Sequence, residues 1–255
     1  MNKTNYNRRI FIIFFAAALC LITICGSAHA VALPTITFAI DDVESPQKVS
    51  NALQILFILT ILSVAPAILL MTTCFTRIVI VLGFVRQAMG TQNMPPTQVI
   101  IGLALFLSFF VMSPTLNKIN QDALQPYIHE EIQQSAALEK AISPMREFMF
   151  SQVKEEALAL LTGLTLDKEP VKQEDIPTMT LIPAFMLSEL KRAFQMGFMI
   201  YIPFLVIDMI VASILMSMGM MMLPPVIISM PFKLLLFVLV DGWNLVVGSL
   251  IKSFG

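Results

Sequence analysis

Two ionisable side chains, Asp208 and Lys233, lie inside otherwise apolar runs near the end of the chain. An ionised side chain costs about 2.5–3.5 kcal/mol at the centre of a membrane helix, so both residues need partners. Opposite charges could form an ion pair that fixes helix register, or they could belong to a proton or ion relay. A relay usually needs more than two groups, which favours the structural interpretation. Pairing within one chain and pairing between neighbouring copies both remain open.

The two charges are predicted to lie at the same depth of a helical hairpin. Apolar runs at 198–218 and 226–240 flank segment 219–225, which contains a glycine and a proline pair. Glycine allows the backbone angles of a tight turn, and proline cannot continue a helix. The midpoint between Asp208 and Lys233 falls inside this turn. At 1.5 Å per residue, each charge is then roughly 18 Å from the tip.

The tip of this hairpin is rich in methionine. Met216, Met218, Met220, Met221 and Met222 lie within seven positions. Methionine is a flexible filler of apolar gaps, which is the simplest explanation. Three consecutive methionines cannot all face one core, however. In a symmetric homo-oligomer identical tips would converge and could form a pliable apolar collar, so both interpretations remain.

Composition indicates a membrane protein. Of the 255 residues, 57% are hydrophobic and 13% are charged, the net charge is −1 and the mean hydropathy is +0.81. Such a charge balance gives no basic surplus for nucleic acid. Beyond residue 30 the chain has one cysteine, Cys74, and one histidine, His129. We therefore predict no catalytic residues, no metal site and no cofactor.

The first thirty residues have the pattern of a cleavable signal peptide. Basic residues precede an apolar run at 10–24, and small residues end at Ala30. Cleavage is predicted between Ala30 and Val31. An uncleaved anchor helix is the alternative. A short polar lead is expected at 31–51.

A first apolar hairpin region is expected at 52–112. Its uncharged run at 52–71 is long enough to cross the membrane, and Pro66 should kink it. The runs at 78–85 and 99–112 suggest a bent or re-entrant pair. From residue 72 to residue 98 the only charges are Arg77 and Arg86, which places this connection in the cytoplasm by the positive-inside rule.

Residues 113–183 form an acidic segment, which holds most of the seventeen acidic residues of the chain. Apolar side chains recur there at helical spacing, so two or three amphipathic helices are expected. If the connection that carries the arginines lies in the cytoplasm, this segment would lie in the periplasm. The second hairpin is then expected at 184–255. Lys191 and Arg192 oppose this sidedness, so the order of spans is better supported than their orientation.

Several motifs resemble the flagellar biosynthetic protein FliP family. In the first half these are residues 75–82 (FTRIVIVL), 86–88 (RQA) and 106–114 (FLSFFVMSP). In the second half, residues 183–190 (PAFMLSEL) with 193–198 (AFQMGF) look like one family signature, and 231–234 (PFKL) through 241–243 (DGW) look like the other.

The resemblance implies an all-α membrane protein whose kinked hairpins assemble into a helical or ring-like oligomeric export gate. Such a gate is not an enzyme. It acts in bacterial flagellum biogenesis as a core of the type III protein export channel in the inner membrane at the basal body. The implied partners are further copies of the chain, FliQ, FliR, other export-apparatus components and unfolded flagellar substrates. Met220, Met221 and Met222 would be its pore gasket, and Asp208 and Lys233 its buried charge pair.

Three alternatives to the flagellar gate are kept. A virulence (injectisome) type III secretion counterpart shares both signatures, although the signal peptide resembles flagellar members. A small-solute or ion transporter would use Asp208 and Lys233, but no inverted repeat is evident. A membrane-anchored periplasmic enzyme would need a catalytic site in 113–183, where His129 is the only histidine.

Overall fold

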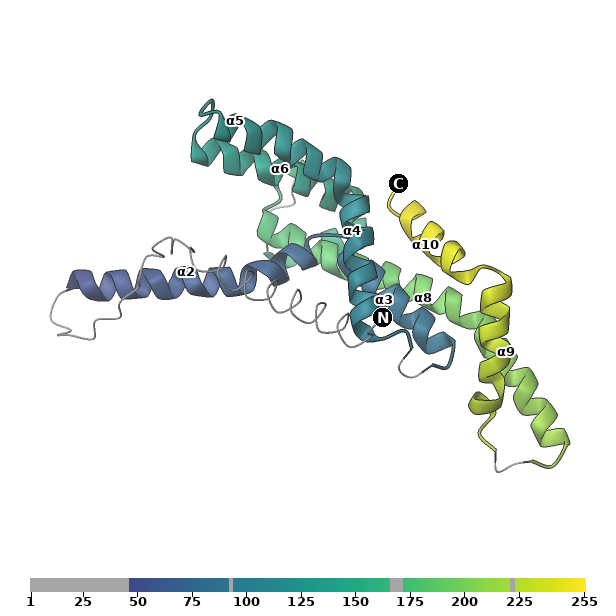
Figure 1. Ribbon diagram of the computed structural model, residues 1–255. Helices are drawn as coiled ribbons and strands as arrows, with labels where there is room; N and C mark the ends of the chain where they lie inside the picture. The colour runs from purple at the N-terminus through teal and green to yellow at the C-terminus, as the bar shows by residue number, and fades with distance from the viewer. Residues whose placement is uncertain (1–45, 92–93, 166–171, 221–222) are drawn as a thin grey trace, which may run out of the picture. The chain divides into compact units, whose positions relative to one another are not determined.

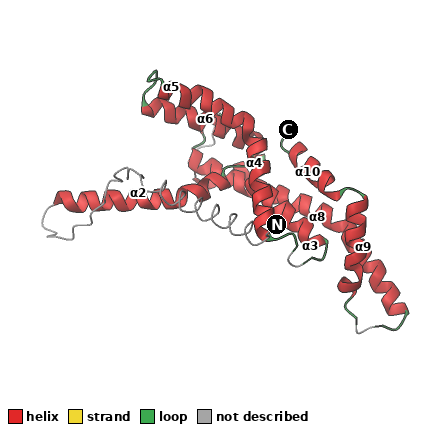
Figure 2. Cartoon of the chain, viewed as in Figure 1, coloured by secondary structure: helices red, strands yellow, loops and turns green. Residues whose placement is uncertain are grey.

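The computed structural model describes residues 46–91, 94–165, 172–220 and 223–255, and their regular secondary structure is entirely helical (Figures 1 and 2). The all-α prediction is thus confirmed. The chain divides into two compact units after Leu56, and the first is described only as the start of one helix. The predicted signal peptide with its Ala30–Val31 cleavage site, most of the polar lead, and Met221 and Met222 lie outside the described residues.

Helix α2 (Pro46–Met71) contains an apolar stretch, Leu53–Met71, that is long enough to cross a membrane. Pro66 lies inside this continuous helix. None of the stretch is buried inside the chain. The helix ends at a turn where the Thr72 hydroxyl donates to the Leu69 carbonyl, 3.2 Å away. The apolar side chains of α2 therefore need a cover that the described part of this chain does not supply.

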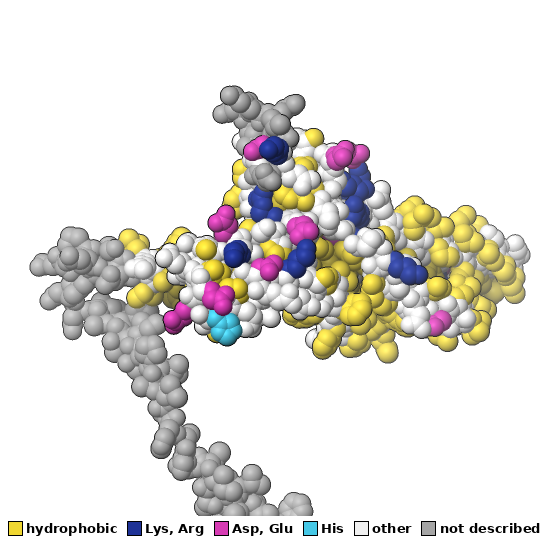
Figure 3. Space-filling model, turned by 90° about the horizontal axis from the view of Figure 1, so that it is seen from above, with side chains coloured by type: hydrophobic (Ala, Val, Ile, Leu, Met, Phe, Trp, Pro, Cys, Tyr) yellow, Lys and Arg dark blue, Asp and Glu magenta, His cyan; other side chains and the backbone are white. Residues whose placement is uncertain are grey.

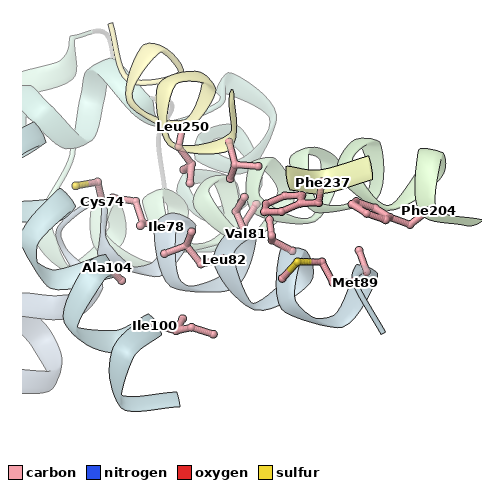
Figure 4. Packing of buried hydrophobic residues seen from close by; sticks show 14 of the residues in the cluster. Cys74, Ile78, Val81, Leu82, Met89, Ile100, Ala104, Phe204, Phe237 and Leu250 are labelled. Carbon is pink, nitrogen blue, oxygen red and sulfur yellow. The ribbon is translucent and has the colours of Figure 1, made fainter. Parts of the chain in front are cut away.

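Helix α3 (Phe75–Ala88) is the centre of the main apolar core, which it forms with α4 (Thr97–Ile119) and α8 (Thr178–Ser217). Its buried residues follow the three- and four-residue spacing of one helix face. Figure 4 shows side chains of α4, α8, α9 and α10 gathered around this face. The buried α3 residues include Ile78, Val81, Leu82, Val85 and Ala88.

Close approach between α3 and α8 depends on Gly197. A Cβ atom built on Gly197 would lie 2.3 Å from the ring of Phe84. The same ring meets Phe194 edge-on, with 5.5 Å between centroids. A side chain at position 197 would therefore push the two helices apart.

The acidic segment forms a helical hairpin. α4 continues into a π-helical turn, η2 (Asn120–Leu124), and a short α5 (Gln125–Ile128), after which the chain returns as α6 (Gln134–Gln152) and α7 (Glu155–Thr165). A second small core joins α6 to the start of α8 through Met149, Ile176, Leu181 and Phe185. A 3₁₀ turn, η3 (Gln173–Asp175), precedes α8 and is bound by Arg146, which donates to the Ile176 carbonyl at 2.8 Å.

The last part of the chain is α8, followed by α9 (Pro225–Leu239) and α10 (Gly242–Lys252). The two final helices meet at a bend of 65°. The bend lies at Asp241, whose φ of 52° is in the left-handed region. By length and composition, three described helices could cross a membrane, or four if α9 and α10 form one broken span.

Candidate functional site

Helices α8 and α9 lie side by side and form the predicted hairpin (Figure 1). Gly219, with φ of 75°, begins the turn after α8, a conformation that glycine adopts without steric cost. The amide of Met220 donates to the Leu215 carbonyl at 3.0 Å and closes the end of the helix. Pro224 is the N-cap of α9, and the helix begins at Pro225, a position where the missing N–H of proline costs no helix hydrogen bond.

The hairpin brings Asp208 and Lys233 together. Lys233 Nζ donates to Asp208 Oδ2 at 2.6 Å. The Lys233 side chain is 2% exposed, whereas that of Asp208 is 21% exposed. This contact lies within one chain, so it needs no neighbouring copy. An ion pair at this position lets two apolar helices carry charges without leaving either charge alone in hydrocarbon.

Ser229 completes this charge pair and was missed by the sequence analysis. Its hydroxyl donates to Asp208 Oδ1, and its side chain is fully buried. Ser229 precedes Lys233 by four residues, so both lie on the same face of α9. That spacing was the signal available in the sequence: a small polar residue one turn from a lysine in an apolar helix.

The described methionines of the tip are solvent-accessible in the isolated chain. Met216 and Met218 are about two-thirds exposed, and Met220 is 37% exposed. Methionine side chains at a tip with no core of their own remain available to an outside partner. Met221 and Met222, the other members of the predicted gasket, lie outside the described residues.

A second buried ion pair joins α3 to α8. Arg77 Nε donates to Glu189 Oε2 at 2.9 Å, and Nη2 donates to the other carboxylate oxygen. Both side chains are completely inaccessible. The sequence analysis used Arg77 as a marker of topology and included both residues in family motifs, but it gave neither of them a partner. The available signal was a single glutamate, next to Ser188 and Leu190, in a largely apolar helix; such a residue must find a partner when it is buried.

Within the described residues the chain shows the chemistry of helix packing rather than that of catalysis. No group of three or more His, Cys, Asp or Glu could hold a metal there. Every buried side-chain nitrogen or oxygen in that part has a hydrogen-bond partner. Cys74 is buried with its thiol 3.7 Å from the Ser108 carbonyl, and His129 is exposed.

Much of the apolar surface of α8 and α9 is uncovered. Figure 3 shows hydrophobic side chains gathered over the end of the molecule that α9 and the neighbouring part of α8 form, whereas charged side chains gather elsewhere on the same face. Exposed apolar surface of this extent marks contact with lipid or with other proteins. The most exposed large side chains of these two helices include Phe198, Met199, Met209, Val238 and Leu239.

Comparison with known proteins finds similarity along most of the chain. The FliP family profile matches residues 58–250. The flagellar biosynthetic protein FliP of Bacillus subtilis is 58% identical over 211 residues, which cover 83% of this chain and 96% of that protein. The FliP proteins of Pectobacterium carotovorum and Aquifex aeolicus are 54% and 52% identical, over 82% and 80% of this chain and 81% and 86% of their own. This similarity and the long apolar helices of the chain together show that it is a membrane protein.

Proposed function

The chain belongs to the FliP family, and from this premise we propose that it is a core membrane subunit of the flagellar type III protein export gate. In this role it helps to form the channel through which unfolded flagellar proteins leave the cell during flagellum assembly. The observation that carries the proposal is the match over residues 58–250, which includes the whole described α8–α9 hairpin. The relatives compared above bear the flagellar name, which favours the flagellar apparatus over its virulence counterpart.

The gate is proposed to be a homo-oligomer that also contains FliQ and FliR and contacts other export-apparatus components. The apolar faces of α2, α4, α8 and α9 support this arrangement, because the residues that the structure describes leave them uncovered. Such a complex would lie in the inner membrane at the flagellar basal body. The signal peptide would be removed after Ala30, and the acidic segment 113–183 would lie in the periplasm.

Within this complex Met220, Met221 and Met222 are proposed to form the pore gasket. Flexible thioether side chains from several copies would close around substrates of variable shape. Asp208 and Lys233 would hold α8 and α9 in register behind the tip. Their contact inside one hairpin supports a structural role, and it gives no support to a solute pathway between them.

The gasket is tested by replacing Met220, Met221 and Met222 together with alanine. We expect the complex to assemble and the membrane to leak small ions, because the apolar constriction is lost while the helices are unchanged. Met209→Ala is the matched control, since Met209 is an exposed methionine of α8 away from the tip. Ion conductance of purified complexes in planar bilayers is the measurement. Unchanged conductance in the triple variant would refute the gasket.

The export role is tested separately by complementation. A strain that lacks its own subunit should regain swimming and secretion of flagellar proteins when it expresses this chain. The detergent-extracted complex should have the mass of several copies together with small membrane proteins. A stable monomer without companions would contradict the proposal.

A further inference from the structure

The residues that follow α10 are bound by side chains of two other helices. Arg77 Nη1 donates to the Ser253 carbonyl at 3.0 Å and to the Ser253 hydroxyl at 2.9 Å. The guanidinium carbon also lies 3.8 Å from the ring centroid of Phe254, within the range of a cation–π contact. Gln152 of α6 donates from Nε2 to the Phe254 carbonyl at 3.2 Å.

The other contacts of Arg77 fix its orientation. Nε and Nη2 bind the Glu189 carboxylate, and Nη2 also donates to Gln152 Oε1 at 3.0 Å. Arg192 donates to the same Gln152 oxygen at 2.7 Å. The amide oxygen of Gln152 therefore accepts hydrogen bonds from two arginines. Its NH₂ group then points toward Phe254 and donates to the carbonyl of that residue. A planar guanidinium can serve all these acceptors at once, whereas a lysine ammonium cannot.

The rest of α10 packs on the main apolar core along one face. Its buried residues are Gly242, Val246 and Leu250, which form a single stripe at four-residue spacing. At its beginning α10 is joined to α9 through the bend at Asp241. Contacts at the end of α10 therefore help to determine the direction in which α9 leaves the core.

We propose that Arg77, Gln152 and Glu189 are positioning residues that form a latch on Ser253 and Phe254. By fixing the end of α10, the latch acts together with the contacts between α8 and α9 to set the direction of α9 and the position of the methionine tip. Only the consequence for gating rests on the proposed export function: a misplaced tip would close the pore less tightly. The latch itself is a property of the chain.

The test uses the full-length protein in lipid nanodiscs, with native cysteines replaced by alanine and spin labels at two exposed positions. Labels at Phe106 of α4 and Val238 of α9 report the direction of α9, and labels at Phe106 and Phe198 of α8 report the core.

Deletion of residues 253–255 should broaden and shift only the distribution of distances between the labels on α4 and α9. Loss of a hydrogen bond to a charged group makes the released α10 roughly tenfold more populated. Lys252→Ala is the control, because Lys252 is exposed in the same turn.

An unchanged distance between α4 and α9 after the deletion would overturn the latch. If the deletion alters both distances, the milder variant Arg77→Lys separates loss of the latch from a general disturbance of the core. This variant keeps the positive charge but loses the planar guanidinium group. A shift of α9 alone in that variant supports the latch, and a wild-type α9 distance refutes it. Neither measurement needs export, so failure of the complementation experiment would leave the distance result standing.

Discussion

The core around α3 includes the first half of α8, and the second half of α8 forms an arm with α9. Each of these two regions contains a buried ion pair, but the two pairs are supported differently. In the core, Arg77 and Glu189 are completely inaccessible, and the guanidinium donates hydrogen bonds to residues of α8, of α6 and of the end of the chain. In the arm, the described partners of Asp208 are Lys233 and Ser229, and part of its side chain remains exposed.

This difference separates what the chain stabilises by itself from what it leaves to its surroundings. The core pair is enclosed by helices of the same chain, and α3 is buried along one whole face. The arm has apolar side chains on its outer faces, among them Met209, Val238 and Leu239, that the described residues of this chain do not cover. Changes in the core should therefore affect the isolated subunit, and changes in the arm should affect assembly.

The largest effect is expected for Glu189→Ala. This substitution leaves the Arg77 guanidinium buried without its carboxylate, and breaking a buried pair in this way typically costs about 3–5 kcal/mol. Thermal unfolding of the detergent-solubilised subunit, followed by circular dichroism, measures the loss. The double variant Arg77→Met with Glu189→Leu should be much less destabilised, because no unpaired charge remains. Equal destabilisation of the single and double variants would show that the charges are not what matters.

A somewhat smaller effect is expected for Lys233→Met in the arm. It leaves Asp208 with one hydroxyl partner in an apolar setting, at a cost of about 2.5–3.5 kcal/mol if the side chain stays ionised in hydrocarbon. We expect this cost to appear as a lower yield of assembled complex, measured by native mass spectrometry. The double variant Asp208→Asn with Lys233→Met should recover much of that yield. If the single and double variants assemble equally badly, pairing is not the role of these residues.

Gly197→Ala tests the core by overpacking. The added methyl group would collide with the Phe84 ring, and such insertions typically cost about 1–3 kcal/mol. Gly83→Ala is the matched control, because a Cβ at position 83 meets nothing within 4 Å. The control should keep or slightly raise the unfolding temperature, since alanine favours helix. An unfolding temperature for Gly197→Ala equal to that of the control would contradict the close packing of α3 on α8.

The sequence predicted the elements better than the contacts between them. Apolar runs and the breakers at 219–225 indicated the α8–α9 hairpin, and equal distances from its tip placed Asp208 and Lys233 at one depth. Periodicity could not show that the pair forms inside one chain, because a neighbouring copy could present the same residues at the same depth. Ser229 was overlooked because a serine in an apolar helix carries no charge to flag it.

The Arg77 cluster illustrates a second limit. Its members come from α3, α6, α8 and the end of the chain, and more than a hundred positions separate Arg77 from Glu189. Sequence patterns report neighbours along one helix, so they cannot bring such distant residues together. Composition likewise marked a change near residues 112 and 183, yet α4 and α8 run as continuous helices through both positions.

The smallest effect concerns an exposed contact between α7 and α8, where Lys191 donates to Glu156. This hydrogen bond lowers the pKa of the Glu156 carboxyl below its ordinary value of 4.5, and the charge of Lys191 adds to the effect. A lowered pKa in the folded chain means that the pair stabilises the fold above pH 4.5 and that this contribution is lost as the pH falls through the lowered value. Because both side chains are well exposed, water and salt screen the pair and the contribution is small. Glu156→Gln should therefore lower the unfolding temperature slightly at pH 7 in low salt and by less at pH 3, with Glu155→Gln as the neighbouring control. A difference that is as large at pH 3 as at pH 7 would mean that Glu156 acts through packing rather than through its charge.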